Sequence, residues 1–335
     1  MTAQILPTHT PALFAAAVKR AVDLLRAGEA VALPTETVYG LAANALDEQA
    51  VARIFQIKGR PANNPIIIHV ASVAMAKHCV TDWPKNAEKL ARAFWPGPLT
   101  LVLPRAPEIP DNVTAGGATV GVRWPSHPLI QAVIRECGFP LAAPSANLSG
   151  RISPTNAGHV RKQVGGKIPV IVDGGQSQVG IESTVLDLTA LPPQILRPGM
   201  IHAESLAAVC GKVQSSKFKI QGSELRSPGL LKKHYSPKAK LLVLNWRHDA
   251  DLTSQLVTCH LSCVTCHVIA HTHIPSAGNF ACVSVIPHDA EAFARAIYGE
   301  LHHCDEAGAE LIVVEAPPAL PEWSGIADRL KRAAA

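Results

Sequence analysis

Four cations in the first two hundred residues stand where the hydropathy pattern predicts that strands begin or end. Lys58 and Arg60 precede an apolar run at residues 66–68, Arg123 follows TVGV, and Arg197 lies in LRPG. Polar turn residues accompany them, namely Ser145, Asn147 and Ser153. Binding residues concentrate on loops that a rigid scaffold holds in place. We therefore interpret these side chains together as a site for an anionic ligand such as a nucleotide.

Taken singly, each of these residues would more often be a solvated surface cation or a side chain that caps a turn. Their recurrence beside strand ends favours the functional interpretation. The sequence contains neither GxxxxGK[ST] nor a GxGxxG motif after a predicted strand. A bound nucleotide would therefore be held by side chains in place of a glycine-rich loop.

A second polar group suits a small zwitterion. It comprises Thr35, Glu36 and Thr37 in PTETVYGL, His69 after the apolar run, and residues 182–184 in GIESTVLDL. Hydroxyl and backbone groups would hold one end of the ligand, and a carboxylate or imidazole the other. The alternative is local, because Ser and Thr cap turns and a single His beside a strand is commonly a satisfied core residue.

The composition excludes several classes of protein. The 335 residues are 47% hydrophobic and 17% charged, which suits two folded domains and argues against wholesale disorder. Aromatic residues make up only 4%, too few for rows of stacking platforms on single-stranded nucleic acid. The net charge of +5 permits an anionic ligand without indicating a dedicated nucleic-acid binder. No apolar run reaches transmembrane length, the N-terminus lacks a signal-peptide pattern, and eight scattered cysteines predict reduced thiols in the cytoplasm.

Short strands alternate irregularly with helices in the first part of the chain. Periodicity predicts helices over residues 11–28, 47–57 (capped by Asp47), 86–94 and 128–137. Strands are predicted at AVALPT, IIIHV, PLTLVL, TVGVR, PLAA, VIVD, STVLDL and LRPGM. The pattern indicates a mixed α/β (α+β) domain over residues 1–205.

Residues 206–237 are polar and poorly periodic, which predicts a linker. The region after it, residues 238–335, alternates regularly. Strands at KLLVLN, CHVIAHT, ACVSVI and LIVVEAPP are separated by helices near residues 249–258 and 291–308. This alternation predicts a small, three-layer, Rossmann-like α/β domain with a mainly parallel sheet.

Seven motifs in this order resemble the YrdC-type threonylcarbamoyl-AMP synthases. They are PTETVYGLAANAL, KGRPANNPIIIHV, FWPGPLTLVL, VGVRWPSHP, PLAAPSANLSGRISPT, DGG…VGIESTVLDL and ILRPGM. The similarity covers about residues 11–205. The segment SPGLLKKHYSP and a trailing domain that ends in GIADRLKRAA resemble the long, two-domain form. The resemblance implies a twisted mixed sheet with a concave basic face. It also implies the synthesis of threonylcarbamoyl-AMP and pyrophosphate from L-threonine, bicarbonate or CO2, and ATP.

The resemblance assigns roles residue by residue. It implies threonine contacts at Thr37, His69, Arg123, Ser183 and the backbone near Ala143. It implies ATP contacts at Arg60, Asn64, Thr119, Ser145, Ser153 and Arg197, with His234 and Tyr235 of the linker as lid residues. Lys58 and Arg60 would be the catalytic cations, with Lys58 a point charge near the phosphates. Lys232 stands where many relatives have an aromatic residue, and a plain spacer is the alternative for this segment.

The resemblance also implies cofactors and partners. Mg2+ would arrive with ATP, held mostly by phosphate oxygens and water, and no carboxylate pair predicts a dedicated metal site. The product would serve a downstream tRNA threonylcarbamoyltransferase complex, which modifies the adenosine beside the anticodon. Weak RNA binding is compatible with a basic face, and no membrane association is expected.

Three alternatives remain at this stage. The segment CHLSCVTCH, residues 259–267, contains CxxCH, with His271 and His273 close by. Haem attachment would need an export signal, and zinc would usually need a second CxxC, so ordinary thiols are favoured. A non-catalytic module that clasps double-stranded RNA would have the basic face but no use for the His and Glu motifs. A carbamoyltransferase subunit would need further domains for which this chain has no room.

Overall fold

The computed structural model describes residues 2–215, 228, 234–258, 265–276 and 280–335. The chain forms two compact units. Unit 1 comprises Met1–Ser149 and Ser153–Leu230, and unit 2 comprises Gly150–Ile152 and Leu231–Ala335. The predicted boundary at residue 205 falls inside helix α8 (Ala203–Cys210). Most of the predicted linker lies outside the described residues.

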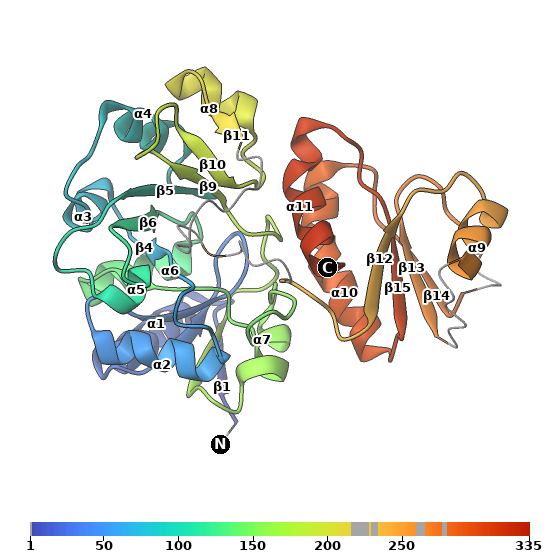
Figure 1. Ribbon diagram of the computed structural model, residues 1–335. Coiled ribbons are helices and arrows are strands. Elements are labelled where there is room, and N and C mark those ends of the chain that lie inside the picture. The colour runs from blue at the N-terminus through green and yellow to red at the C-terminus, as the bar shows by residue number, and fades with distance from the viewer. Residues whose placement is uncertain (1, 216–227, 229–233, 259–264, 277–279) are drawn as a thin grey trace. The chain divides into compact units, whose positions relative to one another are not determined.

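A mixed sheet organises unit 1 (Figure 1). Its eleven described strands lie in the order β1-β8-β2-β3-β7-β4-β6-β5-β9-β10-β11. Their bounds are β1 Gln4–Pro7, β2 Val31–Leu33, β3 Gly40–Asn44, β4 Ile68–His69, β5 Leu99–Pro104, β6 Thr119–Arg123, β7 Leu141–Ala142, β8 Val170–Asp173, β9 Thr184–Asp187, β10 Gln194–Arg197 and β11 Gln214–Ser215. Parallel pairs such as β4–β6 alternate with antiparallel ones such as β5–β6, which confirms the predicted mixed architecture.

Helices border this sheet. Besides α8 they are α1 Pro11–Arg26, α2 Glu48–Lys58, α3 Val73–His78, α4 Lys85–Phe94, α5 Asp111–Thr114, α6 Pro128–Cys137 and α7 Ala157–Val164. The predicted cap of α2 is confirmed, because the Asp47 carboxylate accepts the N–H groups of Gln49 and Ala50 at 2.9 and 3.1 Å. Gly59 ends α2 in the left-handed region, at φ 59°, a conformation that glycine adopts without strain. The helix end therefore turns sharply into the loop that carries Arg60.

The strand predicted at IIIHV is shorter than expected, since only residues 68 and 69 form β4. Pro65 has no N–H to donate, and the N–H of Ile66 bonds the carbonyl of Val113 instead of a sheet partner. Ile66 and Ile68 are buried in the main core, whereas Ile67 joins a separate apolar cluster with Val102, Val185 and Leu196. The apolar run thus serves both faces of the sheet. The prediction also missed β1, β3 and the short helices α3, α5 and α7.

Unit 2 has three layers (Figure 1). Its described strands are β12 Lys240–Leu244, β13 Cys266–Ala270, β14 Cys282–Val285 and β15 Leu311–Glu315, all parallel, in the order β12-β15-β13-β14. Helices α10 (Ala290–Glu306) and α11 (Ser324–Ala333) cover one face, and α9 (Asp249–Thr258) lies on the other. A short 3-10 helix, η2 (Pro321–Trp323), precedes α11. The predicted parallel three-layer domain is confirmed.

A carboxylate occupies the carboxyl edge of this parallel sheet. Glu315, the last residue of β15, is buried and accepts the backbone N–H groups of His271 at 2.7 Å and Thr272 at 2.8 Å. The N–H of His273 lies 3.2 Å from the same carboxylate, and Nδ1 of that residue lies 2.9 Å from it. Burial raises the pKa of Glu315, but these hydrogen bonds outweigh it and leave that pKa below its usual value. The carboxylate is therefore anionic and well bound.

The predicted Cys/His cluster is only partly covered, because Cys259 and Cys263 lie outside the described residues. Within the part of the chain that the structure covers, no three His, Cys, Asp or Glu side chains are arranged to hold a metal ion. The six cysteines with described positions are all free thiols. No helix among the described residues is both long and apolar enough to cross a bilayer.

Candidate active site

The turn at residues 34–39 is built by its own hydroxyl groups. The Thr35 hydroxyl accepts the N–H groups of Thr37 and Val38, each at 3.2 Å, and donates to the Val38 carbonyl at 2.6 Å. The Thr37 hydroxyl lies 2.9 Å from that of Thr35. Because the Thr35 proton is already committed to a carbonyl, Thr37 is the donor in this pair. The turn is thus fixed, and the buried Thr37 oxygen is left to accept a hydrogen bond from outside the turn.

A distant loop holds the same turn from outside. The N–H groups of Val179 and Gly180 donate to the carbonyls of Glu36 and Thr37 at 2.7 and 3.1 Å. Ser177 adds a hydroxyl bond to the Thr35 carbonyl at 3.1 Å. The carbonyls of residues 35–38 are therefore all engaged, and the side chains of the turn are groups that can meet a ligand.

Arg123, at the end of β6, reaches this turn. Its Nη1 donates to the Thr37 hydroxyl at 2.9 Å, its Nε donates to the Gly97 carbonyl at 3.3 Å, and its Nη2 lies 2.7 Å from Oε1 of Glu36. The two charged side chains are only 5% and 8% exposed. The Glu36–Arg123 contact is an ion pair without hydrogen-bond geometry, since neither carboxylate oxygen nor Nη2 has a hydrogen-bond partner among the described residues. Part of the guanidinium donor set thus remains unused.

His69 lies beside Arg123, because the two residues are register partners on the parallel strands β4 and β6. Burial first, and the Arg123 charge second, lower the pKa of His69 to about 3, with a smaller opposing effect from the Ile67 carbonyl. The imidazole is therefore neutral at physiological pH. Its Nδ1 is buried without a hydrogen-bond partner in the described part of the chain. Thr37, Glu36, His69 and Arg123 form one polar group, which we call the Arg123 group.

Two other residues predicted to contact threonine lie on neighbouring elements. Ser183, just before β9, shares a 2.8 Å hydrogen bond with Thr100, and its oxygen and carbonyl accept Nη2 and Nε of Arg197, both at 3.1 Å. Ala143 donates its N–H to the Ile67 carbonyl at 3.2 Å. Ser183 and Arg197, which were predicted to bind different substrates, are thus brought together. Thr100 was missed, although a Thr within the apolar strand LTLVL was a signal that could have indicated it.

Lys58 is buried at the end of α2 and donates to two backbone carbonyls. Its Nζ lies 2.5 Å from the Ser145 oxygen and 2.6 Å from the Asn147 oxygen. Desolvation, and then the Arg60 charge, hold the pKa of Lys58 well below its usual value, against a smaller effect of Glu182. The structure therefore places Lys58 as the group that fixes the loop at residues 145–147, which carries two predicted ligand contacts.

Arg60 binds the loop that follows it. Its Nε donates to the Asn64 carbonyl at 3.1 Å and its Nη2 to the Pro65 carbonyl at 2.7 Å. The Asn64 side chain is fully buried, yet neither its oxygen nor its nitrogen has a hydrogen-bond partner among the described residues. A buried amide without partners is costly, so its presence is a sign of a ligand-facing position.

Ser153 and Glu182 form a separate polar pair. The Ser153 hydroxyl donates to Oε1 of Glu182 at 2.5 Å, and both side chains are buried. The bond joins two of the sequence motifs, which lie 29 residues apart. The predicted ATP contact at Ser153 therefore has a carboxylate beside it.

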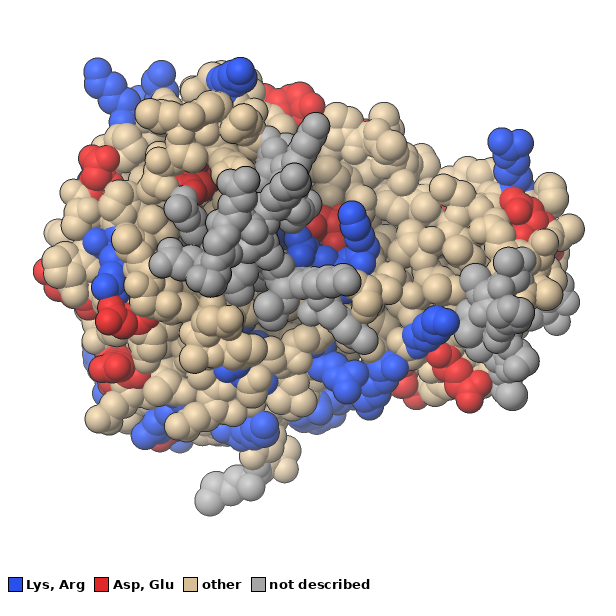
Figure 2. Space-filling view, in the orientation of Figure 1, with Lys and Arg blue, Asp and Glu red and all other residues tan. Residues whose placement is uncertain are grey.

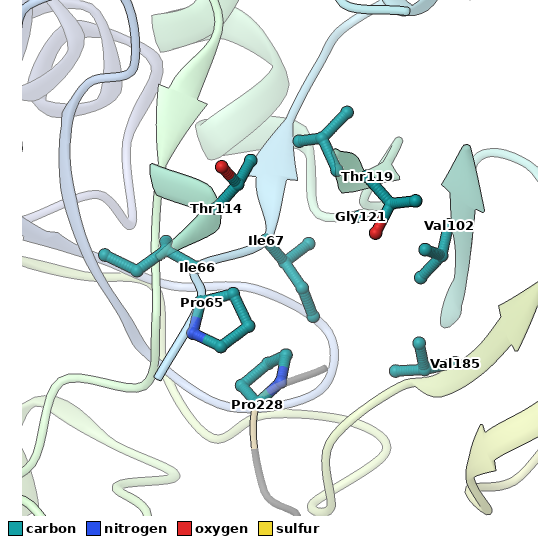
Figure 3. Close-up of a pocket in the computed structure, with 10 residues that line it drawn as sticks. Pro65, Ile66, Ile67, Val102, Thr114, Thr119, Gly121, Val185 and Pro228 are labelled. Carbon is teal, nitrogen blue, oxygen red and sulfur yellow. The ribbon is translucent and has the colours of Figure 1, made fainter. Parts of the chain in front are cut away.

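An apolar pocket opens on the sheet of unit 1 (Figure 3). Little of its space is enclosed, and the rest is open to solvent. Val102 of β5 and Val185 of β9 point into it, as does Ile67, which directly precedes β4; Pro65 and Pro228 lie at one side and Thr119 at the other. Thr119, which was predicted to contact ATP, is one of the residues that line this pocket. A planar, mostly apolar ring would suit these walls.

His234 and Tyr235, the predicted lid residues, belong to unit 2. The His234 N–H bonds the Arg332 carbonyl at 3.3 Å, and the Tyr235 ring lies 5.2 Å from the Arg329 guanidinium carbon. Tyr235 adopts a positive φ of 63°, which is uncommon for a residue other than glycine. The lid role of these residues stays a prediction.

Comparisons with known proteins address the family. Residues 23–199 match the family model described as "Telomere recombination", and residues 201–335 match "Threonylcarbamoyl-AMP synthase, C-terminal domain". The threonylcarbamoyl-AMP synthase of Bacillus subtilis is 39% identical over 331 residues, 95% of this chain and 92% of its own. That of Pyrococcus abyssi is 47% identical over 235 residues, 69% of each chain.

Solved structures agree. A His/Tyr double-alanine variant of P. abyssi Sua5 superposes with a TM-score of 0.89 at 36% identity, covering 99% of this chain and 96% of that one. P. abyssi Sua5 complexed with L-threonine gives a TM-score of 0.88 at 38% identity, with 95% and 94% covered. The predicted resemblance is confirmed, and the chain belongs to the two-domain threonylcarbamoyl-AMP synthase family.

Proposed function

We propose that this chain synthesises threonylcarbamoyl-AMP and pyrophosphate from L-threonine, bicarbonate or CO2, and ATP. The observation that carries the proposal is the Arg123 group, a buried set of polar side chains with unused hydrogen-bonding atoms. A guanidinium, a carboxylate, a hydroxyl and a neutral imidazole complement an amino acid that carries a hydroxyl. The complex of P. abyssi Sua5 with L-threonine adds support from a relative.

The chemistry demands positioning more than covalent catalysis. The threonine amine combines with CO2 to give a carbamate, whose oxygen attacks the α-phosphorus of ATP and displaces pyrophosphate. Negative charge must be stabilised on both sides of that phosphorus, which cations and N–H donors fixed in advance accomplish. Arg60, Lys58 and Arg197 lie at strand or helix ends with defined hydrogen bonds, which supports this role.

Each substrate has a proposed set of residues. The Arg123 guanidinium would bind the threonine carboxylate through its unused donors, with Ser183 and the Ala143 backbone beside the ligand. The apolar pocket would take the adenine ring, with Thr119 at its edge. Arg60, Asn64, Ser145, Ser153 and Arg197 would contact the rest of ATP. Lys58 would act mainly by holding the 145–147 loop, and Mg2+ would enter with ATP as the substrate complex, held by phosphate oxygens and water.

The setting of the reaction is also a proposal. The product would supply a tRNA threonylcarbamoyltransferase complex, because a mixed carbamic–phosphoric anhydride is an activated group donor. The free cysteines of the described chain are compatible with the reducing cytoplasm. His234 and Tyr235 would contact ATP as lid residues, and any RNA binding would be weak.

One assay tests the proposal. Pyrophosphate release from ATP should require both L-threonine and bicarbonate, and should proceed without RNA. Release that ignores threonine would contradict it. Tight binding of double-stranded RNA, without threonine-dependent turnover, would instead support the non-catalytic alternative.

A further inference from the structure

Glu36 is a buried carboxylate to which the family resemblance assigns no role. It is 6% exposed, and its Oε1 lies 2.7 Å from Nη2 of Arg123. A carboxylate that served only to neutralise Arg123 would be expected to accept its N–H groups. Instead, neither oxygen has a hydrogen-bond partner within the described residues. Burying an ionised group without hydrogen bonds is expensive, which indicates that these oxygens serve a ligand.

We infer that Glu36 accepts the α-ammonium group of the amino-acid substrate and so makes the site specific for α-amino acids. The inference rests on the proposed function. In an α-amino acid the ammonium and carboxylate groups are separated by a single carbon atom. Glu36 and Arg123 carry the complementary charges and lie side by side, as the two charged groups of the substrate do. Each substrate charge would therefore meet its complement at once.

The hydrogen bonding leaves donor and acceptor atoms for both contacts. Nη1 and Nε of Arg123 are used by Thr37 and Gly97, and Nη2 directs no hydrogen bond at any described residue. Glu36 thus balances the charge of Arg123, and the remaining N–H groups of Nη1 and Nη2 can still donate to a carboxylate. The nearby His69 is neutral, so it does not replace Glu36 as the anion for an ammonium group.

The same contact would serve the first chemical step. One ammonium N–H bond breaks and its proton passes to the Glu36 carboxylate, which leaves a nitrogen lone pair. That pair forms the N–C bond to CO2, and a C=O electron pair moves onto oxygen to give the carbamate. The second proton on nitrogen leaves to water.

Binding of two ligands, one with an amine and one without, distinguishes an ammonium-binding role of Glu36 from a purely structural role. L-Threonine and 3-hydroxybutanoate both carry the carboxylate and the hydroxyl, but only threonine has the amine. We expect Glu36→Gln to weaken threonine binding by about tenfold or more, as for loss of a charge-assisted hydrogen bond, and to leave 3-hydroxybutanoate binding nearly unchanged, as measured by calorimetry. Glu36→Asp, which keeps the charge, should retain part of the preference for the amine.

Asp187→Asn is the matched control, because it removes another buried carboxylate of unit 1, one that is bonded to Thr189, and should leave the preference for the amine intact. Equal weakening of both ligands by Glu36→Gln would overturn the inference and make Glu36 a structural counter-ion of Arg123. Unchanged threonine affinity in a folded Glu36→Gln variant would overturn it as well. Pyrophosphate release by the wild-type protein tests the proposed function separately, so the two failures are distinguishable.

Discussion

At the scale of single residues, unit 1 combines side chains with fixed partners and side chains that lack them. Lys58 and Arg60 donate hydrogen bonds to backbone carbonyls. By contrast, Asn64, Glu36 and His69 have buried polar atoms without a hydrogen-bond partner among the described residues. The first kind shapes loops, and the second kind is suited to meet a substrate. Arg60 is proposed to do both, since its hydrogen bonds fix a loop and its charge would stabilise the phosphoryl group.

Arg60→Ala tests the proposed contact with ATP. Arg60 fixes the Asn64 and Pro65 carbonyls, and its charge would stabilise the transferring phosphoryl group. We expect pyrophosphate release to fall by about two orders of magnitude or more, as when one preorganised charge donor is removed. Arg53→Ala, which removes a half-exposed cation of α2, should leave turnover nearly unchanged. Full turnover in a folded Arg60→Ala protein would refute the assignment.

The neutral state of His69 has a consequence for stability. The pKa of His69 is about 3 in the folded protein and 6.5 when unperturbed, so only the unfolded chain takes up a proton as the pH falls below about 6.5. The contribution of His69 to the free energy of unfolding is therefore fully present above about pH 6.5. It is lost progressively as the pH falls to about 3. Between pH 7 and pH 5 the loss should be about 2 kcal/mol for this residue.

Urea unfolding of His69→Gln at both pH values would measure this contribution. The variant should lose less stability on acidification than the wild type. His78 is exposed and supplies the matched control. The His78→Gln variant should lose as much stability between pH 7 and pH 5 as the wild type does. Identical pH dependence in all three proteins would show that His69 is not held neutral.

Sequence reasoning at this scale found the residue types but not their partners. Thr37, His69 and Arg123 were predicted together, and the structure joins Thr37 to Arg123 by a hydrogen bond and pairs His69 with Arg123 in register. The contact from Lys58 to the Ser145 carbonyl could not be predicted, because it spans 87 residues and involves only backbone on one side. Every residue has a backbone carbonyl, so the residue type at position 145 gives no indication that its carbonyl binds Lys58.

At the scale of elements, clear periodicity was decisive where it existed. Helices α1, α2 and α6 were predicted because apolar residues recur at helical spacing between recognisable caps. Strand β3, with the sequence GLAAN, was missed because Gly, Ala and Asn are poor strand formers. Its neighbours in the sheet impose the extended conformation. Short strands of this kind depend on tertiary context that local pattern does not carry.

Gly199→Ala tests how closely two motifs pack. A Cβ at Gly199 would lie 2.6 Å from the Thr184 nitrogen and 2.9 Å from the Glu182 carbonyl oxygen, both backbone atoms. The segment at residues 182–184 must therefore shift, which would displace Ser183 and destabilise unit 1. We expect a loss of about 1–3 kcal/mol in unfolding free energy, typical of overpacking, together with weaker threonine binding.

Gly166→Ala is the control for this change, since a Cβ at Gly166 would meet no atom within 4 Å. It should leave both stability and threonine binding nearly unchanged. Equal behaviour of the two variants would mean that the close approach at Gly199 does not constrain Ser183.

At the scale of the whole molecule, each unit carries its own apolar core. Trp246, Leu252, Val268 and Leu311 form part of the core in unit 2. Figure 2 shows Lys and Arg interspersed with Asp and Glu on a mostly uncharged visible face. The modest net charge of +5 gives little support to a dedicated RNA-binding protein.

Thiol reactivity offers a test that spans both units. Burial raises the pKa of Cys79 in unit 1 and of Cys304 in unit 2 to about 12, and each side chain is almost fully buried. A thiolate-selective reagent at pH 8 should leave both unmodified in the native protein and label both after denaturation, as read by peptide mass spectrometry. Rapid labelling of either one in the native state would contradict its buried position.

The Glu315 carboxylate at the carboxyl edge of the unit 2 sheet occupies a position that an anionic ligand could otherwise take. In parallel α/β domains this edge is where phosphate groups commonly meet backbone N–H groups. Here a tethered anion already holds those of His271 and Thr272, at an effective concentration far above that of a free nucleotide in solution. A phosphate would have to displace the Glu315 carboxylate, which is covalently part of the chain, from these N–H groups. Glu315 thus acts as a built-in competitor for any phosphate at this edge of unit 2.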